Sequence, residues 1–388
     1  MPNKYIYMDN NATTQLDEEV ASFMWQNISL YGNASSMHGM GRESEAAIQW
    51  SRLEVAKLLD CDPDGVYFTS GATESNNTVL NTFREEIDKG GKRDRIIVST
   101  IEHPAIIEMC KYLIKKGYKI DFAPVDSTGM IKMDVLKEMM GDDVILVSVM
   151  VGNNETGTIQ PVKEIAQLAH SYGAYMHTDA TQAMGKIPVS CVDLDCDYLS
   201  LSAHKFYGPK GIGVLYVRKK APLVAYLKGG HQEKALRAGT YNTLGIIGLG
   251  KASELAYKNL SAEHDQLWFL RERLRKGIIA ALPETVVNGN QEHCLPGTLD
   301  VSFPAAEGES ILLYLDLEGI EVSTGSACAS GSLEPSYVLL ASGLDIELAH
   351  GSIRFSLGRY NTEAEVDYVI EVLPKIIKKI RSMSTRKA

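Results

Sequence analysis

The sequence is organised around one segment, Cys196-Asp197-Tyr198-Leu199-Ser200-Leu201-Ser202-Ala203-His204-Lys205. Its alternating first half predicts a strand, and the Gly/Pro turn at residues 206–211 must end that strand. Lys205 therefore follows the carboxyl end of a strand, where open α/β sheets bind their ligands. A lysine that forms an imine needs such a fixed and partly desolvated position. For Lys205 considered alone, an ordinary surface lysine in a turn is the better interpretation.

A carboxylate ends the preceding predicted strand, Ala174–Asp179. Because Asp179 and Lys205 lie at equivalent ends of consecutive strands, they can face one crevice. Pyridoxal phosphate needs such a pair, since the amine binds its aldehyde and the carboxylate keeps its ring nitrogen protonated. Asp179 alone would be read as a cap on the next helix. Together the two residues favour a cofactor site.

Strand-like and helix-like segments alternate through the first part of the chain. The expected strands include Val66–Thr69, Arg95–Thr100, Tyr118–Pro124, Val144–Val151 and Gly213–Arg218. The expected helices are 43–59, a helix that follows the turn Ser70–Ser75 and runs through Val79, Leu80, Phe83 and Ile87, and the segments Pro104–Lys116, Asp134–Met140 and Pro161–Tyr172. This alternation predicts an α/β fold, with a mainly parallel sheet and helices on both of its faces.

The pattern changes after about residue 255. A long helix over 252–281 leads to a second, α+β unit, with expected strands Thr298–Phe303 and Ser352–Leu357 and helices Glu309–Leu317 and Glu334–Ala341. A capping box, Thr362-Glu363-Ala364-Glu365, opens the last helix. We therefore expect a large domain over residues 15–255 and a smaller domain formed by residues 1–14 and 256–388.

The composition bounds the function. A chain of 388 residues that is 45% hydrophobic suits a large folded enzyme, and its formal net charge of −10 argues against a nucleic-acid partner. The first residues lack the apolar core of a secretory signal, and the longest apolar run, near Val144–Val151, is too short to span a bilayer. The six cysteines are scattered and lack metal-ligand spacing, so we expect reduced thiols, no metal site and a cytoplasmic protein.

Three further features suggest ligand contacts. The turn Ser70–Ser75 joins a strand to a helix and offers backbone N–H groups to an anion, although a plain capped helix explains it too. His103 can stack on a planar cofactor or move a proton, or it can serve only as a cap at a helix start. Arg354 lies among apolar strand neighbours and needs a partner, for which a substrate carboxylate and a structural acid are equally good candidates.

The loop Ser323–Ser332 is small, polar and rich in glycine, so it cannot build a core. We expect its cysteine, Cys328, to be exposed. An exposed thiol on such a loop suits a nucleophile that reaches a substrate and then carries a product away. The alternative is a neutral linker with an incidental cysteine.

Taken together, these motifs resemble the cysteine desulfurases, pyridoxal-phosphate enzymes of the class V aminotransferase group, and most closely the NifS/IscS type. The resemblance covers essentially the whole chain. It rests on the stretches Met8–Thr14, Phe68–Asn76, Glu102–Pro104, Asn153–Gly157, His177–Gln182, Ser202–Lys205, Arg237–Thr240, Gly325–Cys328 and Ser352–Ser356. It implies an aspartate-aminotransferase-like fold (fold type I) whose large domain holds a seven-stranded, mainly parallel sheet.

The resemblance also implies roles for individual residues. Lys205 would form an imine with pyridoxal 5'-phosphate, Asp179 would contact its ring nitrogen, and Gln182 would contact its ring oxygen. His103 would stack on the ring and take part in proton transfer. The phosphate would be bound by Ala72, Thr73, Ser202 and His204. Asn154 contacts the cofactor and, with Arg354, the carboxylate of the substrate L-cysteine. Thr240 reaches the phosphate of a partner subunit, which implies a homodimer.

The implied reaction removes sulfur from L-cysteine, leaves a persulfide on Cys328 and releases L-alanine. The sulfur would then pass to an iron–sulfur scaffold or a sulfur-carrier protein. Two other functions stay open at the level of sequence. One is another pyridoxal-phosphate enzyme, such as an aminotransferase or a selenocysteine lyase, although a transaminase has no use for the loop cysteine. The other is a sulfur-carrier or scaffold protein that binds partners without catalysis.

Overall fold

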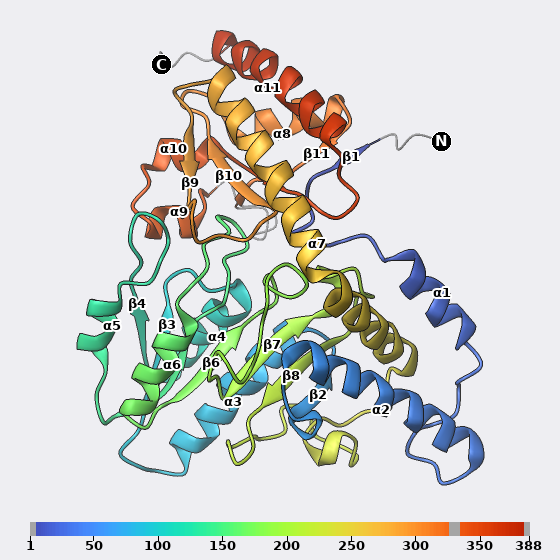
Figure 1. Cartoon of the computed structure of the whole chain (residues 1–388). Helices are drawn as coiled ribbons and strands as arrows, with labels where there is room; N and C mark the ends of the chain where they lie inside the picture. Colours follow the sequence, from blue (N-terminus) through green and yellow to red (C-terminus); the bar gives the residue numbers. More distant parts are fainter. Residues whose placement is uncertain (1–4, 326–333, 384–388) are drawn as a thin grey trace.

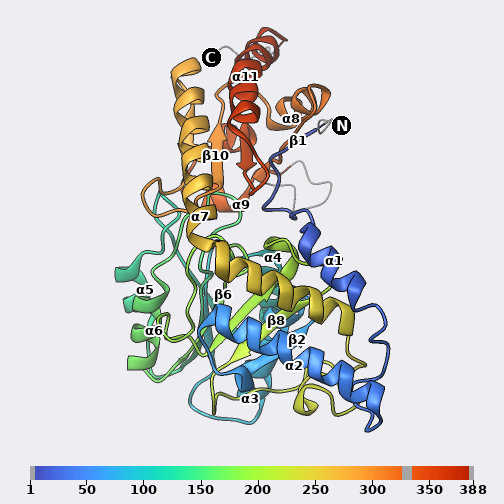
Figure 2. The same ribbon diagram turned by 45° about the vertical axis from the view of Figure 1, so that its right-hand side comes forward.

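The computed structural model describes residues 5–325 and 334–383. Figure 1 shows a larger body built on a central sheet and a smaller body above it, with the long helix α7 (Thr243–Ala281) running from one into the other. Figure 2 shows the same arrangement from a second direction, with α11 (Glu363–Met383) beside the upper half of α7. In the described ranges, no helix is long and apolar enough to cross a membrane.

The central sheet has seven strands in the order β2-β8-β7-β6-β5-β3-β4. Its strands are β2 (Val66–Thr69), β3 (Arg95–Ser99), β4 (Lys119–Ala123), β5 (Val144–Ser148), β6 (Tyr175–Asp179), β7 (Tyr198–Ser202) and β8 (Gly213–Val217). Neighbours from β4 to β7 are parallel, whereas β8 is antiparallel to both β7 and β2. The predicted α/β fold with a mainly parallel sheet is therefore confirmed.

Both faces of this sheet are buried, because successive side chains of a strand point to opposite sides. Ile97 and Val147 belong to the core under α2 (Gly39–Leu59), α6 (Val162–Ser171) and the first half of α7. Their neighbours Ile96 and Leu146 pack on the other side, against α3 (Ala72–Asp88) and α4 (Pro104–Lys115). The strands therefore need apolar residues at consecutive positions, which explains why they lack a polar alternation.

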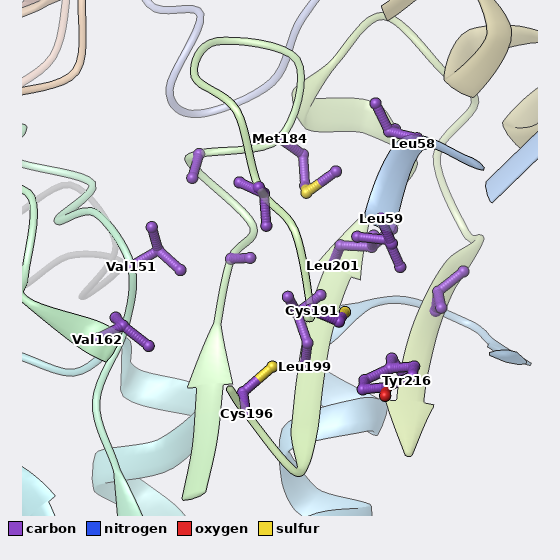
Figure 3. Close-up of a cluster of buried hydrophobic side chains, with 14 of the residues drawn as sticks. Leu58, Leu59, Val151, Val162, Met184, Cys191, Cys196, Leu199, Leu201 and Tyr216 are labelled. Carbon is purple, nitrogen blue, oxygen red and sulfur yellow. The ribbon is translucent and has the colours of Figure 1, made fainter. Parts of the chain in front are cut away.

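Figure 3 shows part of the first core, in which Leu199 and Leu201 of β7 lie near Leu59 of α2 and the thiol of Cys191. The remaining elements of the larger body are α1 (Glu18–Gln26), α5 (Met133–Met139) and the short 3-10 turns η1 (Pro63–Gly65), η2 (Ala203–Lys205) and η3 (Glu233–Ala235). Lys205 is thus the last residue of a turn that follows β7 directly.

The smaller body is built on an antiparallel sheet of order β12-β10-β9. Its strands and helices are β9 (Val286–Asn288), β10 (Thr298–Ser302), α8 (Gly308–Leu317), α9 (Tyr337–Ala341), α10 (Ile346–His350) and β12 (Ser352–Ser356). The N-terminal strand β1 (Ile6–Tyr7) also reaches this region, where it pairs in parallel with β11 (Ile320–Glu321). Leu299, Phe355 and Leu373 belong to a separate core, to which the second half of α7 contributes. The division of the chain into domains near residue 255 stays a prediction.

Element boundaries differ from the expectations at several places; α2, for example, begins at Gly39, four residues before the expected position 43. The helix expected from Glu334 begins only at Tyr337, because Pro335 disfavours a helical conformation for the residue before it and Ser336 caps the helix. The strand expected over Val144–Val151 ends at Ser148, and α7 begins nine residues before Ala252. The capping box is confirmed, since the Glu365 carboxylate accepts from Thr362 N at 2.9 Å and Glu365 N donates to Thr362 Oγ1 at 3.3 Å.

Glu102 ties two strands together at the carboxyl edge of the sheet. Its buried carboxyl Oε1 accepts hydrogen bonds from the Ser99 hydroxyl at the end of β3 and from Met150 N just after β5. Burial, as the largest cause, and the nearby charge of Asp179 raise the pKa of Glu102 to about 8. This contact holds the backbone that leads directly into His103.

We predict that Glu102 makes the stability of the protein depend on pH. Its pKa is about 8 in the folded state against an ordinary value of 4.5, so between these values the folded state binds more protons than the unfolded state. The free energy of unfolding should therefore fall as pH rises across this window, with a contribution from Glu102 approaching about 1.4 kcal/mol per pH unit. Denaturant unfolding from pH 5 to 8 should give a flatter slope for Glu102→Gln. The exposed control Glu108→Gln should keep the parent slope, and an unchanged slope in Glu102→Gln would contradict this account.

Candidate active site

The candidate active site lies at the carboxyl ends of β6 and β7. These strands pair in parallel, with Asp179 opposite Ser200 in the register, and Lys205 follows the end of β7 at Ser202 through the turn η2. Asp179 is buried, and Lys205 is half-buried. The predicted placement of an acid and an amine at equivalent ends of neighbouring strands is therefore confirmed.

Asp179 is held in place through both of its carboxylate oxygens. Asn76 Nδ2 in α3 donates to Asp179 Oδ2 at 2.7 Å, and Thr181 N donates to Asp179 Oδ1 at 2.9 Å. The second contact is made within the turn after β6, and the helix cap that Asp179 alone suggested is wrong, because residues 181–186 form turns and no helix. The first was not predicted, because Asn76 was noted only as part of a motif and its spacing on α3 does not indicate a contact with β6. The two contacts fix the direction of the carboxylate.

Lys205 and Gln182 meet at one backbone carbonyl, that of Asn11. Lys205 Nζ donates to Asn11 O at 2.5 Å and to Ala12 O at 2.8 Å, and Gln182 Nε2 donates to Asn11 O at 2.8 Å. The buried Asn11 side chain in turn donates to Asn154 O at 3.1 Å. The sequence did not predict that Asn11 connects Lys205, Gln182 and Asn154, because Asn11 was considered only within the stretch Met8–Thr14. The polar pair Asn10-Asn11 directly after a strand was the available signal.

Arg354 has one of the two kinds of partner that the sequence left open, a structural acid. It is buried on β12, where Nη2 bonds Asp9 Oδ1 at 2.8 Å and Nη1 donates to Asn154 O at 3.1 Å. A structural acid is therefore present. Even so, Arg354 Nε and Asn154 Oδ1 are buried and have no hydrogen-bond partner among the described residues. Buried polar atoms normally have partners, so these two atoms are suited to a small polar ligand.

Two histidines flank the lysine. His103 caps α4, with Nδ1 accepting from Ala105 N at 3.1 Å, and burial lowers its pKa. The charges of Asp179 and Lys205 act on the pKa of His103 in opposite directions, so the three groups lie near one another. His204 Nδ1 lies 3.1 Å from Thr13 Oγ1, and burial followed by the charges of Lys205 and Lys210 lowers the pKa of His204 to about 4. Both rings are thus held in the neutral form at neutral pH.

The glycine turn before α3 adjoins the same strand ends. Gly71 has a φ of +154°, and Ala72 N donates to Ser202 Oγ at 2.7 Å, which joins the start of α3 to the end of β7. A side chain at Gly213 of β8 would meet Gly71 Cα at 2.6 Å, so only glycine permits this approach. Thr73, in the first turn of α3, is exposed. This helix start has the backbone geometry that binds a phosphate.

Thr240 and Cys328 are the two remaining predicted site residues, and only Thr240 lies in the described part of the chain. Thr240 is exposed and follows a loop that Arg237 ties to Glu74 in the first turn of α3, with a distance of 2.8 Å between Nε and Oε1. Cys328 lies outside the described residues. The described part of its segment ends at Gly325, where an added side chain would meet Glu155 Oε2 at 2.5 Å.

The site as a whole combines a fixed carboxylate, an amine, a neutral histidine and a helix start suited to an anion. These are the groups that pyridoxal phosphate requires, namely an acid for its ring nitrogen, an amine for its aldehyde and backbone donors for its phosphate. The unpartnered atoms of Asn154 and Arg354 add acceptor and donor capacity beside them. The residues present therefore fit this cofactor.

Comparison with known proteins agrees with this geometry. Cysteine desulfurase IscS of Dictyoglomus turgidum is 46% identical over 383 residues, which cover 98% of this chain and 97% of that protein. Cysteine desulfurase NifS of Azotobacter vinelandii is 42% identical over 382 residues, which cover 98% of this chain and 94% of that protein. A solved structure described as a NifS-like protein matches with a TM-score of 0.90 at 40% identity, covering 97% of this chain and 100% of that one.

The structural likeness, together with the seven-stranded sheet, confirms the expected fold type I of the pyridoxal-phosphate enzymes. The family model described as aminotransferase class-V matches residues 6–369. The chain therefore belongs to the class-V aminotransferase family, in its cysteine desulfurase branch.

Proposed function

We propose that this enzyme is a cysteine desulfurase, which removes sulfur from L-cysteine with pyridoxal phosphate and releases L-alanine. The observation that carries the proposal is the placement of Lys205 and Asp179 at one edge of two paired strands, in a chain that also contains Cys328. Cysteine desulfurase relatives that match 98% of the chain support it. The loop thiol distinguishes this reaction from a transamination, which does not need it.

The cofactor would be held from three sides. Lys205 would bind its aldehyde carbon, and Asp179, oriented by Asn76, would keep its ring nitrogen protonated. The other proposed contacts are the ring face for His103, the ring oxygen for Gln182, a polar contact for Asn154, and the phosphate for Ala72, Thr73, Ser202 and His204. When bound, pyridoxal phosphate supplies an electron sink for the pair released at the substrate Cα.

Arg354 and Asn154 would bind the carboxylate of L-cysteine. Arg354 already bonds Asp9 through Nη2, whereas its buried Nε lacks a partner in the described part of the chain. A substrate carboxylate would give Nε an acceptor and compete with Asp9 for the guanidinium plane. The position of Arg354 is fixed by its second bond, to the carbonyl of Asn154.

Different residues would carry out the proton-transfer and sulfur-transfer steps of the reaction. Lys205, once its amine is free because the substrate amine has taken its place, would take the proton from the substrate Cα, and His103, neutral at the pH of the reaction, would assist proton transfer. The thiolate of Cys328 attacks the substrate sulfur. An S–S bond to Cys328 forms as the C–S bond breaks, the bonding pair stays on carbon, and that carbon gains a proton; a second proton, returned to Cα by Lys205, completes L-alanine. Cys328 retains the transferred sulfur as a persulfide.

We also propose a homodimer, a cytoplasmic location, and delivery of the sulfur to an iron–sulfur scaffold or a sulfur-carrier protein. The exposure of Thr240 beside the first turn of α3 supports the dimer, because a second subunit would cover this loop. The composition, with a formal net charge of −10 and scattered cysteines, is consistent with the location. The domain division at about residue 255 belongs to the same set of proposals.

Replacement of Cys328 tests the sulfur-transfer step. With L-cysteine as substrate and dithiothreitol present, Cys328→Ala should lose at least about 100-fold in the rate of alanine formation, because no other thiol is proposed to accept the sulfur. It should still bind the cofactor normally. Cys61→Ala, which removes a half-buried thiol elsewhere, is the matched control and should keep the parent rate. Undiminished turnover in Cys328→Ala would remove this residue from the mechanism.

Replacement of Lys205 tests the cofactor site itself. Purified Lys205→Ala should lack the visible absorbance band that a lysine-linked cofactor gives, and its rate of alanine formation should fall by about 1000-fold or more. Lys219→Ala, an exposed lysine after β8, is the control and should retain both. A lysine-linked band that persists in Lys205→Ala would show that a different amine binds the cofactor.

A further inference from the structure

The loop that follows β6 carries a lysine, Lys186, to which the proposed reaction gives no role. We propose that Lys186 is a positioning residue, which orients the side-chain amides of Gln182 and Asn11 so that Gln182 presents its NH2 group to the cofactor. This inference rests on the proposed function, since it concerns the same cofactor site. It adds a residue that was not among the predicted site residues.

Lys186 is buried and points at two amide oxygens. Its Nζ donates to Asn11 Oδ1 at 2.9 Å and to Gln182 Oε1 at 3.0 Å, and both partners are themselves buried. These acceptors are neutral, so neither contact is an ion pair. The charges of Lys205 and Arg354 act on Lys186, and both repel it. A lysine in this position is electrostatically unfavourable, so its packing alone does not explain its presence.

The donor-only character of an ammonium group decides which way each amide faces. Because Lys186 Nζ offers hydrogens, Gln182 and Asn11 must turn their oxygen atoms toward it. Their NH2 groups then face the other side. Gln182 Nε2 donates to Asn11 O at 2.8 Å, and Asn11 Nδ2 donates to Asn154 O at 3.1 Å and to Thr298 Oγ1 at 2.9 Å.

This orientation matters for the cofactor because its ring oxygen accepts hydrogen bonds. A Gln182 amide has two N–H groups, and one of them donates to the Asn11 carbonyl that also accepts from Lys205. The second N–H group of Gln182 would donate a hydrogen bond to the ring oxygen of the cofactor. With the amide reversed, Gln182 would present an oxygen to that oxygen, and the contact would be repulsive.

Burial, with smaller contributions from Lys205 and Arg354, lowers the pKa of Lys186 to about 7. Deprotonation does not abolish the orienting effect, because a neutral amine keeps two N–H donors for the two amide oxygens. The orientation of Gln182 is therefore held on both sides of neutral pH.

The test uses the full-length protein stripped of cofactor and titrated with pyridoxal phosphate. We expect Lys186→Met to fold with a thermal midpoint moderately below that of the parent, because it removes an unfavourable buried amine but leaves the buried oxygens of Asn11 and Gln182 without their donor. Its affinity for pyridoxal phosphate should nevertheless fall by about tenfold, the effect of losing one good hydrogen bond. The pH at which the visible band of the bound cofactor changes should also shift. Lys219→Met, at an exposed site, should leave all three measurements unchanged.

A double-mutant comparison separates orientation from general disruption. If Lys186 acts through Gln182, then Lys186→Met should weaken binding much less in a Gln182→Ala background than in the parent. An equal loss in both backgrounds, or a folded Lys186→Met variant with parent affinity and an unshifted band, would overturn the inference. Should Lys186→Met fail to fold, Lys186→Gln, which keeps two N–H donors for the same oxygens, should retain most of the parent affinity, and a loss as large as tenfold there would equally overturn the inference. A parent protein that binds no pyridoxal phosphate would instead refute the proposed function.

Discussion

The parallel pairing of β6 with β7 is the constraint on which the site depends. Parallel neighbours bring their carboxyl ends to the same edge of a sheet, so the acid that ends β6 and the lysine after β7 share one side of the molecule. β8 returns antiparallel beside β7, and its Gly213 lets the turn at Gly71 approach these ends closely. The helix start for an anion, the acid and the amine are therefore placed by backbone pairing, before any side chain is considered.

The rest of the site comes from the two ends of the chain. Asn11, just after β1, supplies the carbonyl that Lys205 and Gln182 share, and Arg354 of β12 reaches back to Asp9 and Asn154. Neither segment belongs to the central sheet. The pairing of β1 with β11 and the common core of the smaller body hold both segments against it. The proposed substrate and cofactor contacts would thus require the larger and the smaller body together.

Much of this arrangement could be predicted from local patterns. Alternation of strands and helices, a glycine turn before a helix and polar residues at strand ends indicated the sheet, the anion site and the pair Asp179 and Lys205. What could not be predicted are contacts between residues distant in sequence, such as Asn76 with Asp179 and Arg354 with Asp9. No periodicity encodes them, because they depend on how the helices lie on the sheet. The start of α9 was misplaced for a local reason, the effect of Pro335 on the residue before it.

Burial shifts the pKa of three buried ionisable groups around the site in the direction that favours their neutral forms. Burial raises the pKa of Glu102 and of Glu155 to about 8, and lowers the pKa of Lys186 to about 7. Near neutral pH the two acids therefore largely hold their protons, and about half of the lysine is in its neutral form. Each then acts through hydrogen bonds that fix a neighbour, rather than through its charge. The formal charges near the strand ends therefore belong mainly to groups that can pair with a charged cofactor and substrate. Because few other charges of the described residues lie nearby, each of these pairings is stronger.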